Sequence, residues 1–256
     1  MKMRIIVNAD DFGLSHEANL GIRLAMEKGI CTQTSVVTNS NYFDEAVAIA
    51  KEDGFMDKVG LHINLFEGTP LSAKIKKLKH YCYYDSFRYQ PPLWTAWFRL
   101  FQEELTEELE AQIRKYRAAG FTLYNIDSHH CAFYDFSVLQ ALLPLLEKYG
   151  FKTMRGLGAS FNTGNLLRNV YIRRWQHRFN QTQLQTVPYT SSIATYRKNA
   201  DSLEEKTVAE IYCHPVLIGD YLIDNFTGGT HLEADLQGLL LEQQELITTK
   251  EIEMRR

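Results

Sequence analysis

Short apolar segments alternate with amphipathic segments along most of the chain. Repeated strand-then-helix pairs predict parallel strands with helices outside them, either as a barrel or as a doubly wound sheet. The strand-type segments are Arg4–Val7, Thr32–Thr38, Lys58–Leu65, Phe121–Asp127, Lys152–Arg155 and Val208–Cys213. The helical segments are His16–Gly29, Phe43–Lys51, Glu103–Ala119, Phe136–Tyr149 and a final helix at His231–Ile247. No G-x-G-x-x-G follows the first strand, so a dinucleotide-binding sheet lacks its usual motif.

Two segments interrupt this alternation, near residues 66–100 and 164–195. The first has a basic run and then many aromatic residues, and the second is rich in arginine. We interpret the basic runs as solvated helix faces; the alternative is an aromatic-lined cover over a sugar site. No linker divides the chain, so we expect one domain over residues 1–256 with these two insertions.

Composition narrows the class of protein. The hydrophobic fraction of 45% supports a sizeable core, and the formal net charge of -3 argues against a nucleic-acid or membrane-surface protein. The four cysteines form no C-x-x-C pair, which gives no support to a zinc knuckle or redox dithiol. The apolar run before Asp10 is too short for a signal peptide, so we expect a cytoplasmic protein. A homodimer is the default expectation for its oligomeric state.

Polar side chains gather where four of the predicted strands end. Asp10 and Asp11 follow the first strand in "NADDFG", His62 lies near the end of "VGLHINL", His129 follows "YNIDS", and His214 follows "EIYC". The carboxyl ends of parallel strands are where active sites of barrels and open α/β sheets are built. We therefore expect these side chains to meet at one site.

Strand alternation supports the same arrangement. In "VGLHINL", the apolar residues share one face, and His62 and Asn64 share the other with Gly60. In "YNIDSH", Asn125, Asp127 and His129 share a face. The apolar face should pack against helices, so His62 and Asp127 are predicted to point to the opposite face, toward the interior of a barrel.

Two histidines and a carboxylate form a common ligand set for a divalent metal. Asp11, His62 and His129 would hold the ion, Asp10 would act as general base, and His214 would act as general acid. A cation would also explain why two neighbouring carboxylates are tolerated, with Gly13 allowing a sharp turn. Spacing alone does not decide between this metal site and a simpler interpretation. In the simpler one, the aspartates form a turn or helix cap and the histidines are ordinary polar residues of strands. His130 is expected to point away, and the remaining histidines are expected to be ordinary polar residues: His16, His80, His177 and His231.

At these residues the sequence resembles the YdjC-like carbohydrate deacetylases of the chitooligosaccharide deacetylase type. The matching segments are "NADDFG" at 8–13, "TSVVTN" at 34–39, "VGLHINL" at 59–65 with "GTPL" following, "IDSHH" at 126–130, "TMRGL" around Arg155, and "EIYCHP" at 210–215. The resemblance implies a distorted (β/α) barrel like that of the polysaccharide deacetylases, with seven strands. It also implies metal-dependent removal of an N-acetyl group from a sugar.

The resemblance also implies roles for particular residues. It makes Asp11, His62 and His129 the metal ligands, Asp10 the base and His214 the acid. Arg155 is implied as a structural or substrate partner near the base. Asp127 is expected to orient a ligand histidine, which is an inference from its strand face, and Asn64 is expected to bind substrate or support the site.

Two departures from the family pattern concern the substrate. Cys131 and Phe133 stand where further histidines are common, and "GGTHLEADL" replaces the usual Arg- and Glu-rich start of the last helix. The expected reaction is deacetylation of a chitooligosaccharide-like sugar. The alternatives are hydrolysis of another amide or ester at the same site, and a non-catalytic sugar-binding or regulatory protein.

The expected cofactor is one divalent metal ion. An Asp-His-His set suits zinc, and it also accepts magnesium, manganese, cobalt or nickel when water completes the shell. Zinc and magnesium are the first candidates.

Overall fold

The structure is a computed structural model. It describes residues 3–79, 81–88, 101–157, 166–204, 207–227, 230–237 and 244–253. Part of the first predicted insertion therefore lies outside the described residues, including its aromatic residues Trp94 and Trp97, and so do His80 and residues 158–165.

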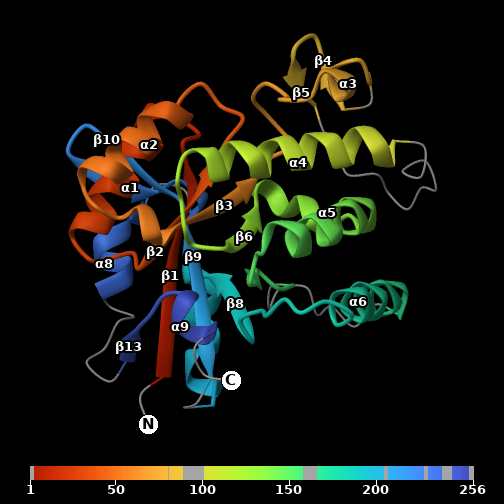
Figure 1. The fold of residues 1–256 in the computed structure, drawn as a ribbon. Helices are drawn as coiled ribbons and strands as arrows, with labels where there is room; N and C mark the ends of the chain where they lie inside the picture. The colour runs from red at the N-terminus through yellow and green to blue at the C-terminus, as the bar shows by residue number, and fades with distance from the viewer. Residues whose placement is uncertain are drawn as a thin grey trace.

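A curled, parallel β-sheet forms the centre of the molecule (Figure 1). Its strands follow the order β7-β6-β3-β2-β1-β9-β8, and β13 also pairs with β1. Every strand pair in this sheet is parallel. The strands are β1 (Met3–Phe12), β2 (Gln33–Val37), β3 (Val59–Ile63), β6 (Asn125–Ser128), β7 (Thr153–Met154), β8 (Tyr189–Ser192), β9 (Val208–Cys213) and β13 (Gln244–Leu246).

The gap between the outer strands β7 and β8 is bridged by the chain that leads into β8. Gln185 donates from its backbone nitrogen to the oxygen of Lys152 at 2.9 Å, and its oxygen accepts from the Met154 nitrogen at 2.9 Å. This bridge links β7 to the segment that leads into β8. The expected distorted (β/α) barrel with a seven-stranded path is thus confirmed.

Helices cover the outside of this sheet, as repeated strand–helix pairs predict (Figure 1). Local sequence fixes their ends. The Ser15 hydroxyl caps α1 by accepting from the Ala18 nitrogen, and α5 begins at the Asp135 carboxylate and ends at Gly150 in a left-handed conformation. The principal helices are α1 (His16–Glu27), α2 (Phe43–Glu52), α4 (Gln102–Ala118), α5 (Phe136–Tyr149) and α6 (Leu166–Phe179).

Smaller elements decorate the barrel. The helix α3 and the β4–β5 hairpin lie beyond α4 at the top of Figure 1. A separate antiparallel sheet of β10, β11 and β12 follows β9 and packs against α1. These smaller elements are α3 (Ala73–Lys76), β4 (Cys82–Tyr83), β5 (Ser86–Phe87), α7 (Ile193–Asn199), β10 (Pro215–Ile218), β11 (Tyr221–Asp224), β12 (Thr230–His231), α8 (Leu232–Gln237) and α9 (Lys250–Glu253).

The predicted final helix at His231–Ile247 is wrong. In the described residues, α8 lies at its start and strand β13 near its end, where β13 pairs with the first residues of β1. Residues 238–243 of this prediction lie outside the described residues. The physical reason is a free edge: β2 pairs with β1 only from Asn8 onward, so the first half of β1 can pair with another strand. Ile247 then packs with Ile6 and Val208 in a small separate cluster.

The second predicted insertion contains regular structure rather than a long loop. It includes α6 and the sheet strand β8. The sequence of β8, Tyr-Thr-Ser-Ser, has no apolar alternation and is held by its pairing with β9. Periodicity could not identify it for that reason.

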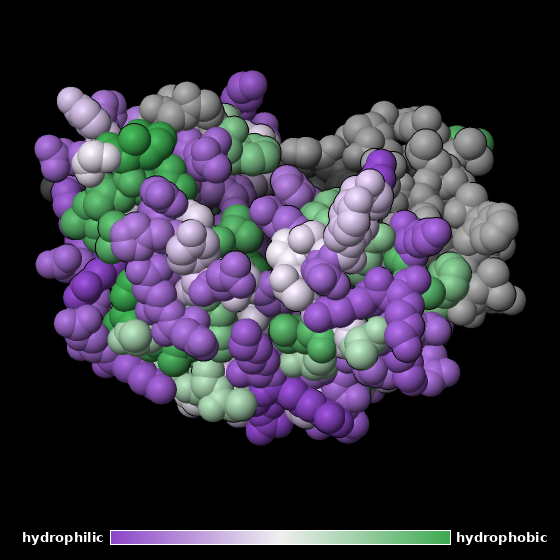
Figure 2. Space-filling model, turned by 90° about the horizontal axis from the view of Figure 1, so that it is seen from above, coloured by the Kyte–Doolittle hydropathy of each residue, from purple (hydrophilic) through white to green (hydrophobic). Residues whose placement is uncertain are grey.

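The face seen from above is largely hydrophilic, and hydrophobic residues appear among the polar ones in separate groups (Figure 2). Within the described ranges, no helix combines the length and the apolar character needed to cross a membrane.

Candidate active site

The polar residues predicted at the strand ends do meet. Asp10 and Asp11 end β1, His62 lies on β3, His129 follows β6 and His214 follows β9. Asp10, Asp11, His62 and His129 are all buried, and His214 is partly exposed. Four elements distant in sequence therefore deliver carboxylates and imidazoles to one place.

An irregularity in β1 explains how two adjacent aspartates enter the same site. In a regular strand, neighbouring side chains point to opposite faces. Between Ala9 and Phe12 the register with β2 shifts by one residue, and Asp11 has a φ of 74°. This bulge turns the Asp11 side chain toward the face that Asp10 already occupies.

Gly13 completes the turn after the bulge. Its φ is 82°, and a Cβ atom there would lie 2.9 Å from the backbone oxygen of Val37. The side chain of Asn19 accepts a hydrogen bond from the Gly13 nitrogen at 2.6 Å. The glycine of "NADDFG" is thus required both by backbone conformation and by close contact with β2.

Asp11, His62 and His129 form a compact group. Asp11 Oδ1 lies 3.1 Å from His62 Nε2 and 2.7 Å from His129 Nδ1. The ligand atoms of the three residues all lie within 4.8 Å of one another. One oxygen and two nitrogens therefore converge on a single point.

The donor set fits a divalent cation. The Nε2 atom of His62 is buried and makes no hydrogen bond to any described residue, whereas its Nδ1 contacts Asp127 Oδ1 at 2.7 Å. A buried nitrogen aimed at a carboxylate, with its second nitrogen already held, is the arrangement of a metal-ligating histidine. Several carboxylates are also buried here around a single arginine, and a cation would offset their excess negative charge.

Arg155, just after β7, links three of those carboxylates. It contacts Asp10 through two nitrogens, Nη1 to Oδ2 at 2.6 Å and Nη2 to Oδ1 at 2.7 Å. Its Nη2 lies 2.8 Å from Asp127 Oδ2, and its Nε donates to Glu210 Oε1 at 2.8 Å. Arg155 therefore fixes the orientation of Asp10 in the interior of the barrel.

His214 lies on the other side of Asp10. Its Nε2 is 3.9 Å from Asp10 Oδ2, and its Nδ1 is 3.7 Å from Asp224 Oδ1 on β11. Asp224 also accepts a hydrogen bond from the His214 backbone nitrogen at 2.9 Å. The ring of Phe226 stacks on the imidazole with centroids 5.2 Å apart. Asp224 at the end of β11 and Phe226 just after it thus hold His214 in place.

The charges of the neighbours set the protonation of the site. Burial opposes ionisation of Asp10, but Arg155 outweighs it and lowers the pKa of that carboxyl. Burial would lower the pKa of His62, yet Asp127 and Asp11 raise it to about 10. Burial would likewise lower the pKa of His214, but Asp224 and Asp10 raise it above its usual value. The surroundings therefore favour the ionised form of Asp10 and the protonated form of His214.

The remaining residues singled out in the sequence lie around this cluster or in the core. Asp127 Oδ1 lies 2.7 Å from the Nδ1 atom of His62, and Asn64 forms hydrogen bonds within the loop that follows β3. Phe133 is buried in the core and Cys131 is exposed. His130 is exposed, and its ring centroid lies 4.2 Å from that of the neighbouring His129. The strand ends at Ser128, so alternation no longer applies to the left-handed residues after it.

Sequence reasoning missed three residues of this neighbourhood: Glu67, Glu210 and Asp224. Glu210 lies on β9 at the same alternation as His214, which directly follows that strand, so alternation could have identified it. Glu67 and Asp224 lie on a loop and on β11, and no local pattern marks either of them.

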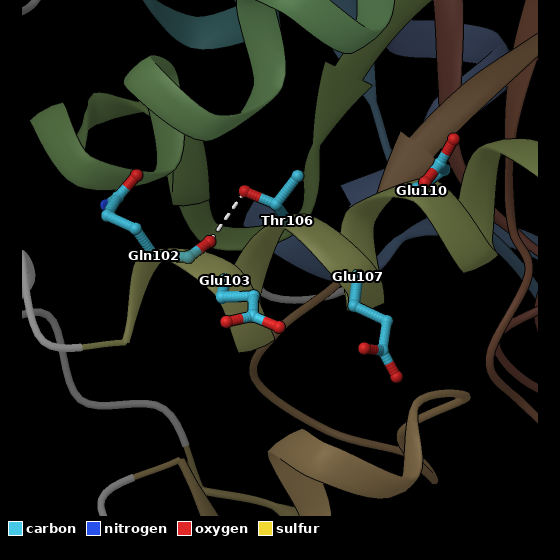
Figure 3. A pocket seen from close by; sticks show the side chains of 5 residues that line it. All are labelled: Gln102, Glu103, Thr106, Glu107 and Glu110. Atoms are coloured by element: carbon cyan, nitrogen blue, oxygen red, sulfur yellow. Dashed lines mark hydrogen bonds between the residues drawn. The ribbon is translucent and has the colours of Figure 1, made fainter.

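A hollow of about 460 Å³ on the outer side of α4 is unrelated to this cluster (Figure 3). It is lined by Gln102, Glu103, Thr106, Glu107 and Glu110, none of which belongs to the site. Lys74 of α3 forms ion pairs with Glu103 at 2.8 Å and Glu107 at 2.9 Å. These carboxylates are therefore already paired on the surface.

The fold and the cluster together define a distorted parallel α/β barrel with an Asp-His-His group at the carboxyl ends of its strands. The family profile described as YdjC-like protein matches residues 4–245. This chain belongs to the YdjC-like family.

Named relatives are found in several bacteria. A carbohydrate deacetylase of Brevibacillus brevis is 38% identical over 223 residues, covering 86% of this chain and 84% of that protein. Carbohydrate deacetylase 1 of Listeria innocua is 36% identical over 160 residues, covering 60% of this chain and 61% of that protein. The chain thus matches less than two thirds of the Listeria relative's length.

A solved structure supports the fold. The crystal structure of a candidate cellobiose-phosphate cleavage protein from Enterococcus faecalis V583 superposes with a TM-score of 0.71. It covers 98% of this chain and 99% of its own at 21% identity. At that identity the likeness concerns the fold alone.

Proposed function

We propose that this protein is a metal-dependent hydrolase that removes the N-acetyl group from an N-acetylated sugar. The observation that carries the proposal is the position of Asp10, which lies between Arg155 and His214 beside the Asp-His-His group. The carbohydrate deacetylase names of the relatives support the choice of substrate. We also propose that residues 1–256 act as one domain, in the cytoplasm, and as a homodimer.

In this proposal Asp11, His62 and His129 hold one divalent cation, with zinc or magnesium as the first candidates. When bound, the cation supplies Lewis-acid polarisation of the acetyl carbonyl and makes a water more acidic. Asp127 supports the cation site by fixing the His62 ring through Nδ1.

Asp10 and His214 divide the proton transfers. Asp10, kept ionised by Arg155, takes a proton from the water that attacks the acetyl carbon. His214, whose protonated form Asp224 favours by raising its pKa, donates a proton to the sugar nitrogen as it departs. An unprotonated amine anion is a poor leaving group, so the reaction needs an acid such as His214 close to the sugar nitrogen.

Acetate release from N-acetylglucosamine oligomers tests this function. Metal-stripped protein is supplied with zinc, magnesium, manganese, cobalt or nickel in turn. We expect acetate only with added metal, and loss of both metal binding and activity in His62→Ala. His16→Ala is the matched control, because His16 is an exposed histidine paired with Glu45 outside the site.

Asp10→Asn separates metal binding from catalysis. It should retain the metal and lose roughly 10²–10⁴-fold in rate, the usual contribution of a general base. Metal content is measured on the same preparation. Full activity in Asp10→Asn would exclude it as the base. No acetate from any sugar, with metal still bound, would favour hydrolysis of another amide or ester.

A further inference from the structure

We propose that Glu67 is a positioning residue that orients the imidazole of His129 toward the cation site. The proposal rests on the metal ligands assigned in the proposed function. Glu67 lies in the loop after β3 and belongs to none of the roles given so far.

The two nitrogens of His129 have different partners. Nδ1 lies 2.7 Å from Asp11 Oδ1, and Nε2 lies 2.9 Å from Glu67 Oε1. If Nδ1 is the atom that faces the cation, Nε2 must carry the proton. Glu67 is placed to accept that proton in a hydrogen bond and so to fix both the tautomer and the ring orientation.

His62 has the same arrangement with its nitrogens reversed. Its Nε2 faces Asp11 at 3.1 Å and its Nδ1 contacts Asp127 at 2.7 Å. Each histidine thus presents one nitrogen to Asp11 and has the other held by a carboxylate. Glu67 thus contacts the second nitrogen of His129 in the same way as Asp127 contacts that of His62. The two carboxylates differ in exposure, since Asp127 is fully buried and the Glu67 side chain is 54% exposed.

The loop that carries Glu67 is held by several hydrogen bonds, which fix the backbone from which the Glu67 side chain extends toward His129. The Asn64 side chain accepts hydrogen bonds from the nitrogens of Phe66 at 3.0 Å and Glu67 at 3.3 Å. It also donates to the Glu67 backbone oxygen at 2.8 Å. Asn64 therefore shapes the turn in which Glu67 sits.

Asn39, which follows β2, anchors the same loop from the neighbouring strand. Its backbone oxygen accepts from the Thr69 nitrogen at 3.1 Å, and its side chain donates to the Glu67 oxygen at 3.3 Å. Gly68 has a φ of 75°, and a Cβ there would lie 2.6 Å from the Asn39 oxygen. The backbone of the loop is thus fixed on both sides of Glu67.

The experiment measures zinc affinity directly, by competition with a chelating dye, so its result does not depend on the substrate or on turnover. We expect Glu67→Ala to weaken zinc binding about 10- to 100-fold, the usual cost of losing such a partner. Glu67→Gln keeps an oxygen that can accept from Nε2 and should stay within a few-fold of the unsubstituted protein. Glu103→Ala is the control, because it removes an equally charged residue that is 80% exposed on α4.

Nitrogen-15 NMR of the zinc-loaded proteins supplies a second readout. We expect a protected Nε2 proton on His129 in the unsubstituted protein and in Glu67→Gln, and its loss in Glu67→Ala. Equal zinc affinity in Glu67→Ala and Glu103→Ala would overturn the proposal. So would equal weakening in the Ala and Gln variants, which would indicate charge alone, or a proton found on Nδ1. If the protein released no acetate from any sugar, only the proposed reaction would be contradicted, because zinc affinity is measured without substrate.

Discussion

Arg155 holds Asp10 by both of its carboxylate oxygens, at 2.6 Å and 2.7 Å. The same guanidinium contacts Asp127 and Glu210, so one buried cation orients the proposed base, supports the partner of His62, and reaches across to β9. A planar fork with several donors can make these contacts together, whereas an ammonium group cannot.

Removing this guanidinium should destabilise the fold as well as the site. We expect Arg155→Ala to lower the free energy of unfolding by about 3–5 kcal/mol, because it leaves buried carboxylates without their partner. Urea denaturation measures the loss. The control is Arg23→Ala, which removes a surface arginine paired with Asp53 and should cost about 1 kcal/mol or less. Equal effects of the two substitutions would contradict this account of Arg155.

The pair of Asp224 and His214 predicts a change in pH dependence. The Asp224 carboxylate helps to raise the pKa of His214, so Asp224→Asn should lower that pKa. A general acid works in its protonated form, which is lost as pH rises through the pKa. The alkaline limb of kcat/KM should therefore move to lower pH, and activity should fall more under mildly alkaline than under mildly acidic conditions.

The Asn variant suits this test because its amide oxygen can still accept from the backbone nitrogens of His214 and Phe226. Asp220→Asn, in the exposed turn between β10 and β11, is the matched control. An alkaline limb that stays in place in Asp224→Asn would show that Asp224 does not tune His214.

The turn after the two aspartates predicts a difference between two glycines. Gly13 and Gly29 both have positive φ, but only Gly13 has backbone atoms close to where a Cβ would lie. Alanine in a left-handed conformation costs roughly 1–2 kcal/mol, and at Gly13 the contact with Val37 adds to that. We expect Gly13→Ala to be clearly less stable than Gly29→Ala in chemical denaturation. Equal stabilities would mean that the chain at Gly13 relaxes easily.

The sequence by itself determined the order of strands and helices through most of the chain. It also determined which strand ends carry aspartate and histidine. These features follow from local periodicity, because a parallel strand buried on both sides is a short apolar run and its carboxyl end is where polar groups can cluster. The motifs around Asp10, His62 and His214 also pointed to the family and to the barrel.

Only the tertiary structure decided how these residues are partnered. The bulge that turns Asp11 beside Asp10 depends on the register with β2, and the strand pairing of β13 depends on the free edge of β1. The contact between Glu67 and His129 joins residues far apart in the chain, as does the contact between Arg155 and Glu210. Such contacts arise from pairing between distant segments, and a pattern read along one segment carries no information about the partner that another segment brings.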